Sequence, residues 1–195
     1  MTEPSELPGP HIAGLIVLAR FEYVKRTHGA EGVRRVLDAL PADERARLLD
    51  VERDAYYPFS TLIVLDRTIA RLFPEGEDAF DRLGEFSARL RNEWLGEHKA
   101  LVSPHAYLSR LAEDNRRLQS FGQARYRRIS FEEGEIAYSE YPEIDPAFCR
   151  SGRAFLRASL EHLVDGGVSV EETRCQSRGD DSCVFAMKWS SRGGQ

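Results

Sequence analysis

The chain has 195 residues, of which 30% are charged and 42% hydrophobic, and its formal net charge is −5. This composition is that of a globular protein and excludes the disordered and fibrous classes. The acidic balance argues against a dedicated nucleic-acid-binding protein, which would carry a basic field. We expect one domain over residues 11–190, preceded by a flexible N-terminus over residues 1–10.

The location of the protein is indicated by what its N-terminal part lacks. No basic segment followed by an apolar one marks a signal peptide at the start. The longest apolar run, Leu15 to Ala19, ends at Arg20 and is far shorter than the roughly 20 residues of a membrane span. We therefore expect a cytoplasmic protein with no membrane partner.

The first 118 residues have apolar side chains at helical spacing, in segments that begin or end at Gly or Pro. The predicted helices cover residues 12–27, 30–40, 42–49, 57–73, 77–95 and 104–118.

The pattern changes after Gly122 to alternating strands around one further helix. We expect the first two strands to be joined by a turn at Glu133-Gly134, and a helix that ends at Gly166-Gly167. The predicted order is strand 125–131, strand 136–141, helix 147–164, strand 168–174 and strand 183–189. The fold class is therefore α+β, with a helical half over 11–118 and a ββαββ antiparallel-sheet half over 119–190.

All three cysteines, Cys149, Cys175 and Cys183, lie in the last quarter of the chain. Cys175 and Cys183 stand on either side of a tight turn, and Cys149 opens the preceding helix. Zinc prefers four N, S or O ligands in a tetrahedron, and Glu171 or Glu172 offers a carboxylate as the fourth. The alternative is three inert cysteines that pack as small apolar residues.

The segment from Cys149 to Trp189 resembles the 4-vinyl-reductase domain family, which also supplies the sensory domain of phenol-responsive transcription activators. Those sensors hold a structural zinc through three Cys and one Glu. The Glu lies three residues before the second Cys, the first Cys lies 26 residues before the second, and the third lies eight after it. Cys149, Glu172, Cys175 and Cys183 match these spacings. The resemblance therefore implies a structural zinc on these four residues.

A geometric difficulty accompanies Glu172. On a regular strand, residues three apart point to opposite faces, so that Glu171 and not Glu172 would share a face with Cys175. The strand must bulge or end before Cys175 if Glu172 is to bind the metal, and Glu171 remains the reserve ligand. Three thiolates and one carboxylate around Zn²⁺ carry a formal charge of −2, which Arg174 or Arg178 could offset.

The same resemblance implies a ligand pocket between the helices and the sheet, because members of the family bind apolar or aromatic small molecules there. Tyr126, Tyr138, Phe148 and Phe155 are the candidate ligand-binding residues; the alternative is that they fill a solid core. The Trp that the phenol sensors place 21 residues before the first Cys is Arg128 here. This favours a ligand other than phenol, one with an acidic group included.

The wider superfamily includes heme-based nitric-oxide sensors and Golgi trafficking-particle subunits, and its helical half followed by ββαββ is similar to this chain. Two alternatives to a ligand sensor follow. One is an interaction scaffold with a filled core. The other is a heme sensor, for which His98 and His105 are available but the segment Tyr107 to Leu111 departs from the expected Tyr-x-Ser-x-Arg motif.

No catalytic motif or nucleotide-binding loop is visible in the chain, so we do not expect an enzyme. No DNA-binding or kinase signature is visible either, so a sensor of this kind would signal through a protein partner or a homodimer. The apolar faces of the predicted helices 12–27 and 77–95 offer surface for such a dimer. The sequence thus predicts a cytoplasmic sensory or binding domain for a small apolar or aromatic ligand, with a structural zinc.

Overall fold

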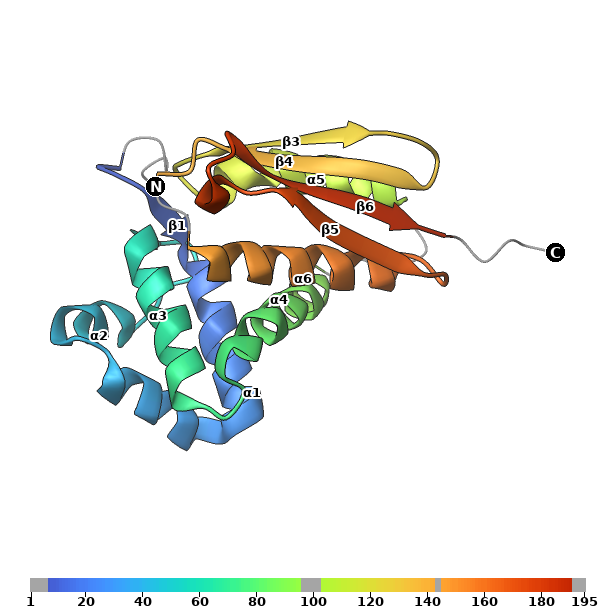
Figure 1. The fold of residues 1–195 in the computed structure, drawn as a ribbon. Helices are drawn as coiled ribbons and strands as arrows, with labels where there is room; N and C mark the ends of the chain where they lie inside the picture. The colour runs from blue at the N-terminus through green and yellow to red at the C-terminus, as the bar shows by residue number, and fades with distance from the viewer. Residues whose placement is uncertain (1–6, 96–102, 143–144, 191–195) are drawn as a thin grey trace.

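The computed structural model describes residues 7–95, 103–142 and 145–190 (Figure 1). Its helices are α1 (Gly14–Ala39), α2 (Ala42–Leu48), α3 (Phe59–Leu72), α4 (Ala79–Leu95), α5 (Pro104–Leu118) and α6 (Pro146–Leu163), with short 3-10 helices η2 (Gly76–Asp78) and η3 (Gln176–Arg178). Its strands are β1 (His11–Ala13), β2 (Tyr56–Pro58), β3 (Gln123–Arg128), β4 (Glu133–Ser139), β5 (Val168–Arg174) and β6 (Ser182–Trp189). Within these ranges no helix is long and apolar enough to cross a membrane.

The C-terminal half is a four-stranded antiparallel sheet in the order β3-β4-β6-β5, packed against α5 and α6. Alternate residues of β6, among them Cys183, Phe185 and Met187, are buried in the core between sheet and helices. Leu156 and Leu160 of α6 meet them there. The α+β prediction, with helices first and an antiparallel sheet second, is confirmed.

The N-terminal half forms a second core from α1, α3 and α4, with Phe59, Leu62 and Leu65 of α3 fully buried. Figure 1 shows this helical layer on the side of α6 away from the sheet. The helix α6 therefore lies between the two cores. Its two faces belong to different neighbours, and any space enclosed between them is walled by both halves of the chain.

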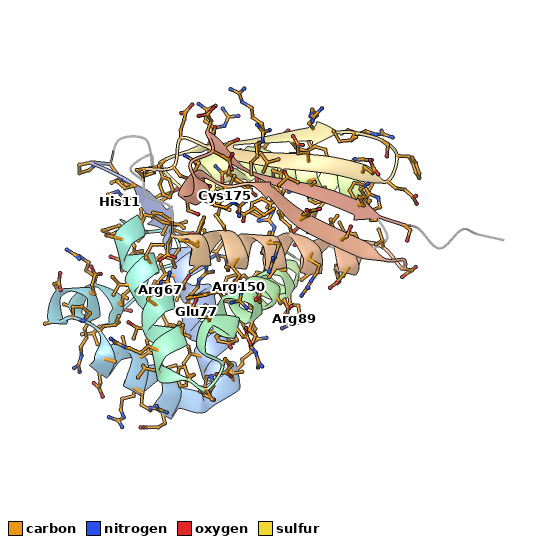
Figure 2. All side chains as sticks on the ribbon, in the orientation of Figure 1. His11, Arg67, Glu77, Arg89, Arg150 and Cys175 are labelled. Carbon is orange, nitrogen blue, oxygen red and sulfur yellow. The ribbon has the colours of Figure 1, made fainter. Side chains whose placement is uncertain are left out.

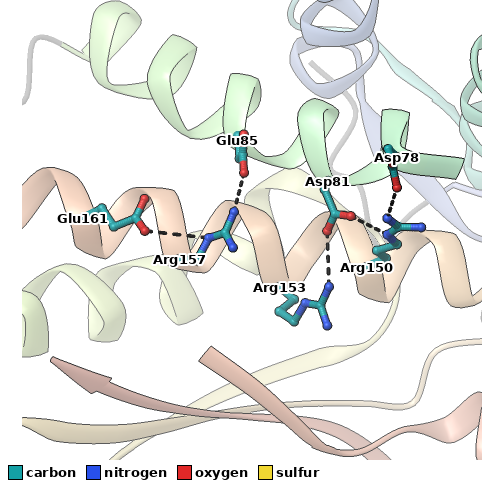
Figure 3. Close-up of polar contacts among 7 residues, drawn as sticks. All are labelled: Asp78, Asp81, Glu85, Arg150, Arg153, Arg157 and Glu161. Carbon is teal, nitrogen blue, oxygen red and sulfur yellow. Dashed lines mark hydrogen bonds and ion pairs between the residues drawn. The ribbon is translucent and has the colours of Figure 1, made fainter. Parts of the chain in front are cut away.

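Two features bring α4 and α6 into close contact. A Cβ atom on Gly84 of α4 would overlap the backbone carbonyl of Ser151, so glycine is what allows the two backbones to approach. Along the exposed side of this seam runs a series of ion pairs, in which Asp81 accepts from Arg150 at 2.5 Å and from Arg153 at 3.3 Å (Figure 3). The seam fixes the position of α6, which carries several of the predicted site residues.

The structure differs from the sequence-based expectations in three places. Residues 12–40 form one helix with a kink at Gly29, where φ is 71°, and not two separate helices. A small sheet of β1 and β2, which the periodicity did not reveal, precedes α1 and α3. The turn expected at Glu133-Gly134 lies earlier, between β3 and β4, and both residues pair within β4. Gly134 is needed in the strand because the ring of Tyr126 lies over it.

Candidate metal centre and adjoining cavity

The four residues predicted to bind a metal come together at one end of the sheet. Cys149 lies in the first turns of α6, Glu172 in β5, Cys175 directly after β5, and Cys183 in β6. One ligand atom from each of them lies within 4.8 Å of all the others. Figure 2 shows Cys175 at the end of the sheet that faces the start of α6.

A β-bulge places Glu172 in this group. Glu172 pairs with Phe185 of β6, but Arg174 already pairs with Val184, so Thr173 is the extra residue on the bulged strand. The bulge shifts the alternation of side chains by one position. Glu172 and Cys175 therefore turn to the same side, while Glu171 is exposed.

The sulfur atoms have the spacing of a metal site and not of a disulfide. The distances between sulfurs are 3.5 Å for Cys149 and Cys183, 3.7 Å for Cys149 and Cys175, and 3.8 Å for Cys183 and Cys175. A disulfide would need about 2.0 Å. Thiolates at about 2.3 Å from a tetrahedral zinc lie about 3.8 Å from one another. The three thiols are thus arranged as three corners of a zinc tetrahedron.

The carboxylate of Glu172 is suited to the fourth corner. One of its oxygens, Oε2, accepts a hydrogen bond of 3.0 Å from the guanidinium of Arg178. The other, Oε1, is buried and has no hydrogen-bond partner among the described residues. A buried carboxylate oxygen without a partner costs free energy, and a cation bound to Oε1 would remove that cost. Arg178 also offsets part of the negative charge of the ligand set.

Hydrogen bonds among the thiols separate their proton affinities. The pKa of Cys183 is lowered to about 6, chiefly because the thiol of Cys149 donates to its sulfur, with a further contribution from the backbone N–H of Gln176 at 3.4 Å. The same shared proton raises the pKa of Cys149, and burial raises that of Cys175. One thiolate is thus available near neutral pH, and an incoming metal ion would displace the protons of the other two.

A cavity of about 220 Å³ adjoins this centre. Cys149 and Cys183 form part of its wall, so the metal site and the cavity share two residues. The remaining wall comes from four helices, α1, α4, α5 and α6, and from the inner face of the sheet. Exposed Arg53 and Trp94, whose side chains stack at 5.6 Å, lie where the cavity reaches the surface.

Three of the four predicted ligand-binding residues line this cavity, namely Tyr138, Phe148 and Phe155. Tyr126 lies outside it. Its hydroxyl group donates to Nδ1 of His105 at 2.5 Å, while Nε2 of His105 bonds the carbonyl of Phe131 at 2.8 Å. These bonds hold Tyr126 nearer to the hairpin tip than Tyr138.

The acidic ligand suggested by Arg128 finds no support in the position of that residue. Arg128 ends β3 and bonds the carbonyl of Ser130 at the surface of the hairpin, away from the cavity lining. The cavity does contain an arginine that the sequence analysis did not single out. Arg20 of α1 is 4% exposed and donates to both carboxylate oxygens of Asp66, at 3.1 and 3.3 Å, and to Ser87.

Further lining residues were missed because they come from helices that are distant in sequence. Ser87, Asn115 and Gly152 all line the cavity from α4, α5 and α6. A Cβ atom on Gly152 would meet only Phe185 Cζ at 4.0 Å, so this glycine leaves open space. One signal was available: Arg20 interrupts an otherwise apolar helix face, which indicates a buried charge with a partner.

Comparisons with known proteins address the family and the fold separately. The family model of the 4-vinyl-reductase domain matches residues 131–188, a segment that contains all four candidate metal ligands. No curated protein matches the chain.

Solved H-NOX structures match nearly the whole chain in three dimensions. An H-NOX protein from S. oneidensis in the Fe(II)NO ligation state is 16% identical, with a TM-score of 0.71, over 92% of this chain and 100% of that one. An Fe(II) unliganded H-NOX protein from K. algicida is 12% identical, with a TM-score of 0.64, over 94% and 100%. At such identities the likeness concerns the fold alone. The chain thus has an H-NOX-like α+β fold, and its residues 131–188 match the 4-vinyl-reductase domain.

Proposed function

We propose that this chain is a sensory domain that binds a small apolar molecule in the cavity beside the cysteine cluster. The match to the 4-vinyl-reductase domain and the H-NOX-like fold support a small-ligand sensor. The observation that carries the proposal is the cavity itself, about 220 Å³ in volume and walled mainly by apolar side chains such as Tyr138, Phe155 and Phe185. A scaffold with a filled core would not need it.

In this proposal Cys149, Glu172, Cys175 and Cys183 hold a structural zinc. Four protein ligands leave no open position for water, so the metal would supply folding energy and no catalysis. It would tie the start of α6 to β5 and β6. Because Cys149 and Cys183 also line the cavity, the same ion would fix one wall of the ligand site.

Heme is the alternative that the H-NOX likeness raises. Among the described residues, none that lines the cavity is a histidine. Both ring nitrogens of His105 already have partners in Tyr126 and Phe131, and His98 lies outside the described residues. A Soret absorption band in the purified protein would favour heme, and its absence from a protein that binds aromatic molecules would favour our proposal.

A cavity-filling variant tests the proposal. Gly152→Leu adds four carbon atoms where a side chain meets open space, so it should abolish the stabilisation of the protein by ligands. We expect small aromatic molecules to raise the melting temperature of the wild type in proportion to their concentration and to leave that of Gly152→Leu unchanged.

The matched control is Gly152→Ala, which makes the same helix position more favourable but leaves most of the cavity open. It should keep the response to ligands. Equal responses of the wild type and Gly152→Leu, or none in either across a library of aromatic and aliphatic molecules, would contradict the proposal and favour a scaffold.

A further inference from the structure

Asn115 stands out among the polar groups on the cavity wall. Its side chain is 8% exposed, and its amide Nδ2 is buried without a hydrogen-bond partner among the described residues. Asn115 belongs to α5, on the same helix face as Leu111 and Leu118, and all three line the cavity. An amide N–H that lacks an acceptor in an apolar site is costly, and a ligand that offers an acceptor removes the cost.

Neighbouring polar groups already have their partners. Gln119 donates through Nε2 to the carbonyl of Phe121 at 2.9 Å and to the hydroxyl of Tyr141 at 2.7 Å. Ser87 accepts from Arg20 at 3.2 Å and donates to the carbonyl of Leu83 at 2.7 Å. The orphaned donor of Asn115 is therefore not part of a network that a small shift would complete.

The charges on the wall are paired as well. Arg20 forms its ion pair with Asp66, and Arg91 forms one of 2.8 Å with Asp114. An anionic ligand would have to compete with these carboxylates or remain buried without a counter-charge, which is unfavourable in an apolar site. The wall thus favours an uncharged ligand.

The volume sets the size of the ligand. An apolar cavity of roughly 150 Å³ binds benzene. The cavity here is about 220 Å³, which leaves room for one aromatic ring and about three further non-hydrogen atoms.

From these observations we infer that the ligand is an uncharged molecule of about one aromatic ring whose carbonyl or similar oxygen accepts a hydrogen bond from Asn115 Nδ2. The inference rests on the proposed function and specifies its ligand class. Tyr138 offers a second polar group on the same wall. Burial raises the pKa of Tyr138, so its hydroxyl stays protonated and neutral.

Three molecules of equal size separate the possibilities. Acetophenone, α-methylstyrene and benzoate each have one ring and three further non-hydrogen atoms, and they present a carbonyl, a hydrocarbon and a carboxylate respectively. By calorimetric titration of the full chain we expect acetophenone to bind about tenfold more tightly than α-methylstyrene, and benzoate to bind most weakly.

The matched variant is Asn115→Leu, which keeps a similar shape but has no donor. It should bind α-methylstyrene at least as tightly as acetophenone, because the hydrocarbon gains more on leaving water. Its melting temperature without ligand should rise, since the orphaned amide is gone. A merely structural asparagine would instead lose stability when replaced.

The outcomes distinguish this inference from the function on which it rests. Equal binding of acetophenone and α-methylstyrene by the wild type, or an unchanged preference in Asn115→Leu, would overturn the role of Asn115 while the sensor proposal survives. Tightest binding of benzoate would overturn the uncharged class. Failure of all three molecules to bind, with Gly152→Leu behaving as the wild type does, would overturn both.

Discussion

Thr173 shows how a single residue decides the geometry of the metal centre. The spacing of Cys149, Glu172, Cys175 and Cys183 predicts a four-ligand set, but regular strand geometry would turn Glu172 away from Cys175. The bulge at Thr173 resolves this conflict in favour of Glu172. A register shift of this kind depends on pairing with β6, so it could not be derived from the alternation of β5 alone.

Glutamate substitutions test the assignment of the fourth ligand. We expect the wild type, purified without added metal, to contain about one zinc per chain by elemental analysis. Glu172→Gln should lower this content and the affinity for zinc, because the carboxylate with the buried, unpartnered Oε1 is lost. The matched control Glu171→Gln changes the exposed neighbour and should keep the metal.

The thiols should matter still more. Cys183→Ser should bring the zinc content close to zero and reduce the free energy of unfolding by about 3 kcal/mol or more, a minor share of the roughly 10–16 kcal/mol that zinc supplies to zinc-finger peptides. Urea unfolding measures this change. A wild type without zinc, or equal losses in Glu171→Gln and Glu172→Gln, would contradict the assignment.

At the scale of elements, the seam between α4 and α6 holds one wall of the cavity in place. Gly84 and Gly152 both lie on helices of this seam and both line the cavity, but their surroundings differ. Gly84 is in contact with the backbone of Ser151, whereas Gly152 faces open space. Sequence patterns identify both as helical glycines and cannot distinguish them, because the difference lies in the partner helix.

The two glycines should respond to alanine in opposite directions. Gly84→Ala forces α4 and α6 apart and should lower the free energy of unfolding by about 1–3 kcal/mol. Gly152→Ala should raise it by up to about 1 kcal/mol, because alanine is the better helix former and has room here. Chemical denaturation of the two variants measures both values. A loss of stability in Gly152→Ala as large as that in Gly84→Ala would show that the cavity is filled.

Ion pairs between the helices should differ in value according to their burial. Asp66 and Arg20 connect α3 to α1 with side chains that are each 5% exposed, whereas Asp81 and Arg150 connect α4 to α6 at 25% and 32%. Asp66→Asn leaves a buried guanidinium without its counter-charge and should cost about 3–5 kcal/mol. Asp81→Asn should cost no more than about 1 kcal/mol. Denaturation of both variants that gives similar losses would contradict this ranking.

For the whole molecule, the sequence predicts the fold class and the metal ligands better than the cavity. Helical periodicity and the strands at either end of α6 identify the two halves, and residue spacing identifies the cysteine cluster. The cavity, in contrast, is a product of how α1 and α4 lie against α6. Arg20, Asn115 and Gly152 reach it from three helices, and no local pattern joins them.

The surface expected for a homodimer also changes once the fold is known. The apolar faces of α1 and α4 are buried in the N-terminal core and are not available to a partner. Large exposed apolar side chains occur instead at the β3–β4 connection, where Ile129 is 46% and Phe131 is 73% exposed. A homodimer stays our prediction, now with this connection in the interface.

Light scattering at micromolar concentration should give twice the monomer mass of 22.1 kDa for the wild type. Phe131→Ser should shift the mass towards the monomer without loss of stability, because the side chain is exposed in the single chain. A monomeric wild type would contradict the prediction, and an unchanged dimer in Phe131→Ser would place the interface elsewhere.

Anomalous diffraction from a xenon-pressurised crystal of the full chain tests the central claim most directly, because one experiment locates both the metal and the empty volume. Xenon enters dry apolar cavities. The account predicts a zinc peak between Cys149, Glu172, Cys175 and Cys183, and a xenon peak in the adjoining space between Tyr138 and Phe155. A crystal with side chains packed through that space and no anomalous peak at either position would contradict it.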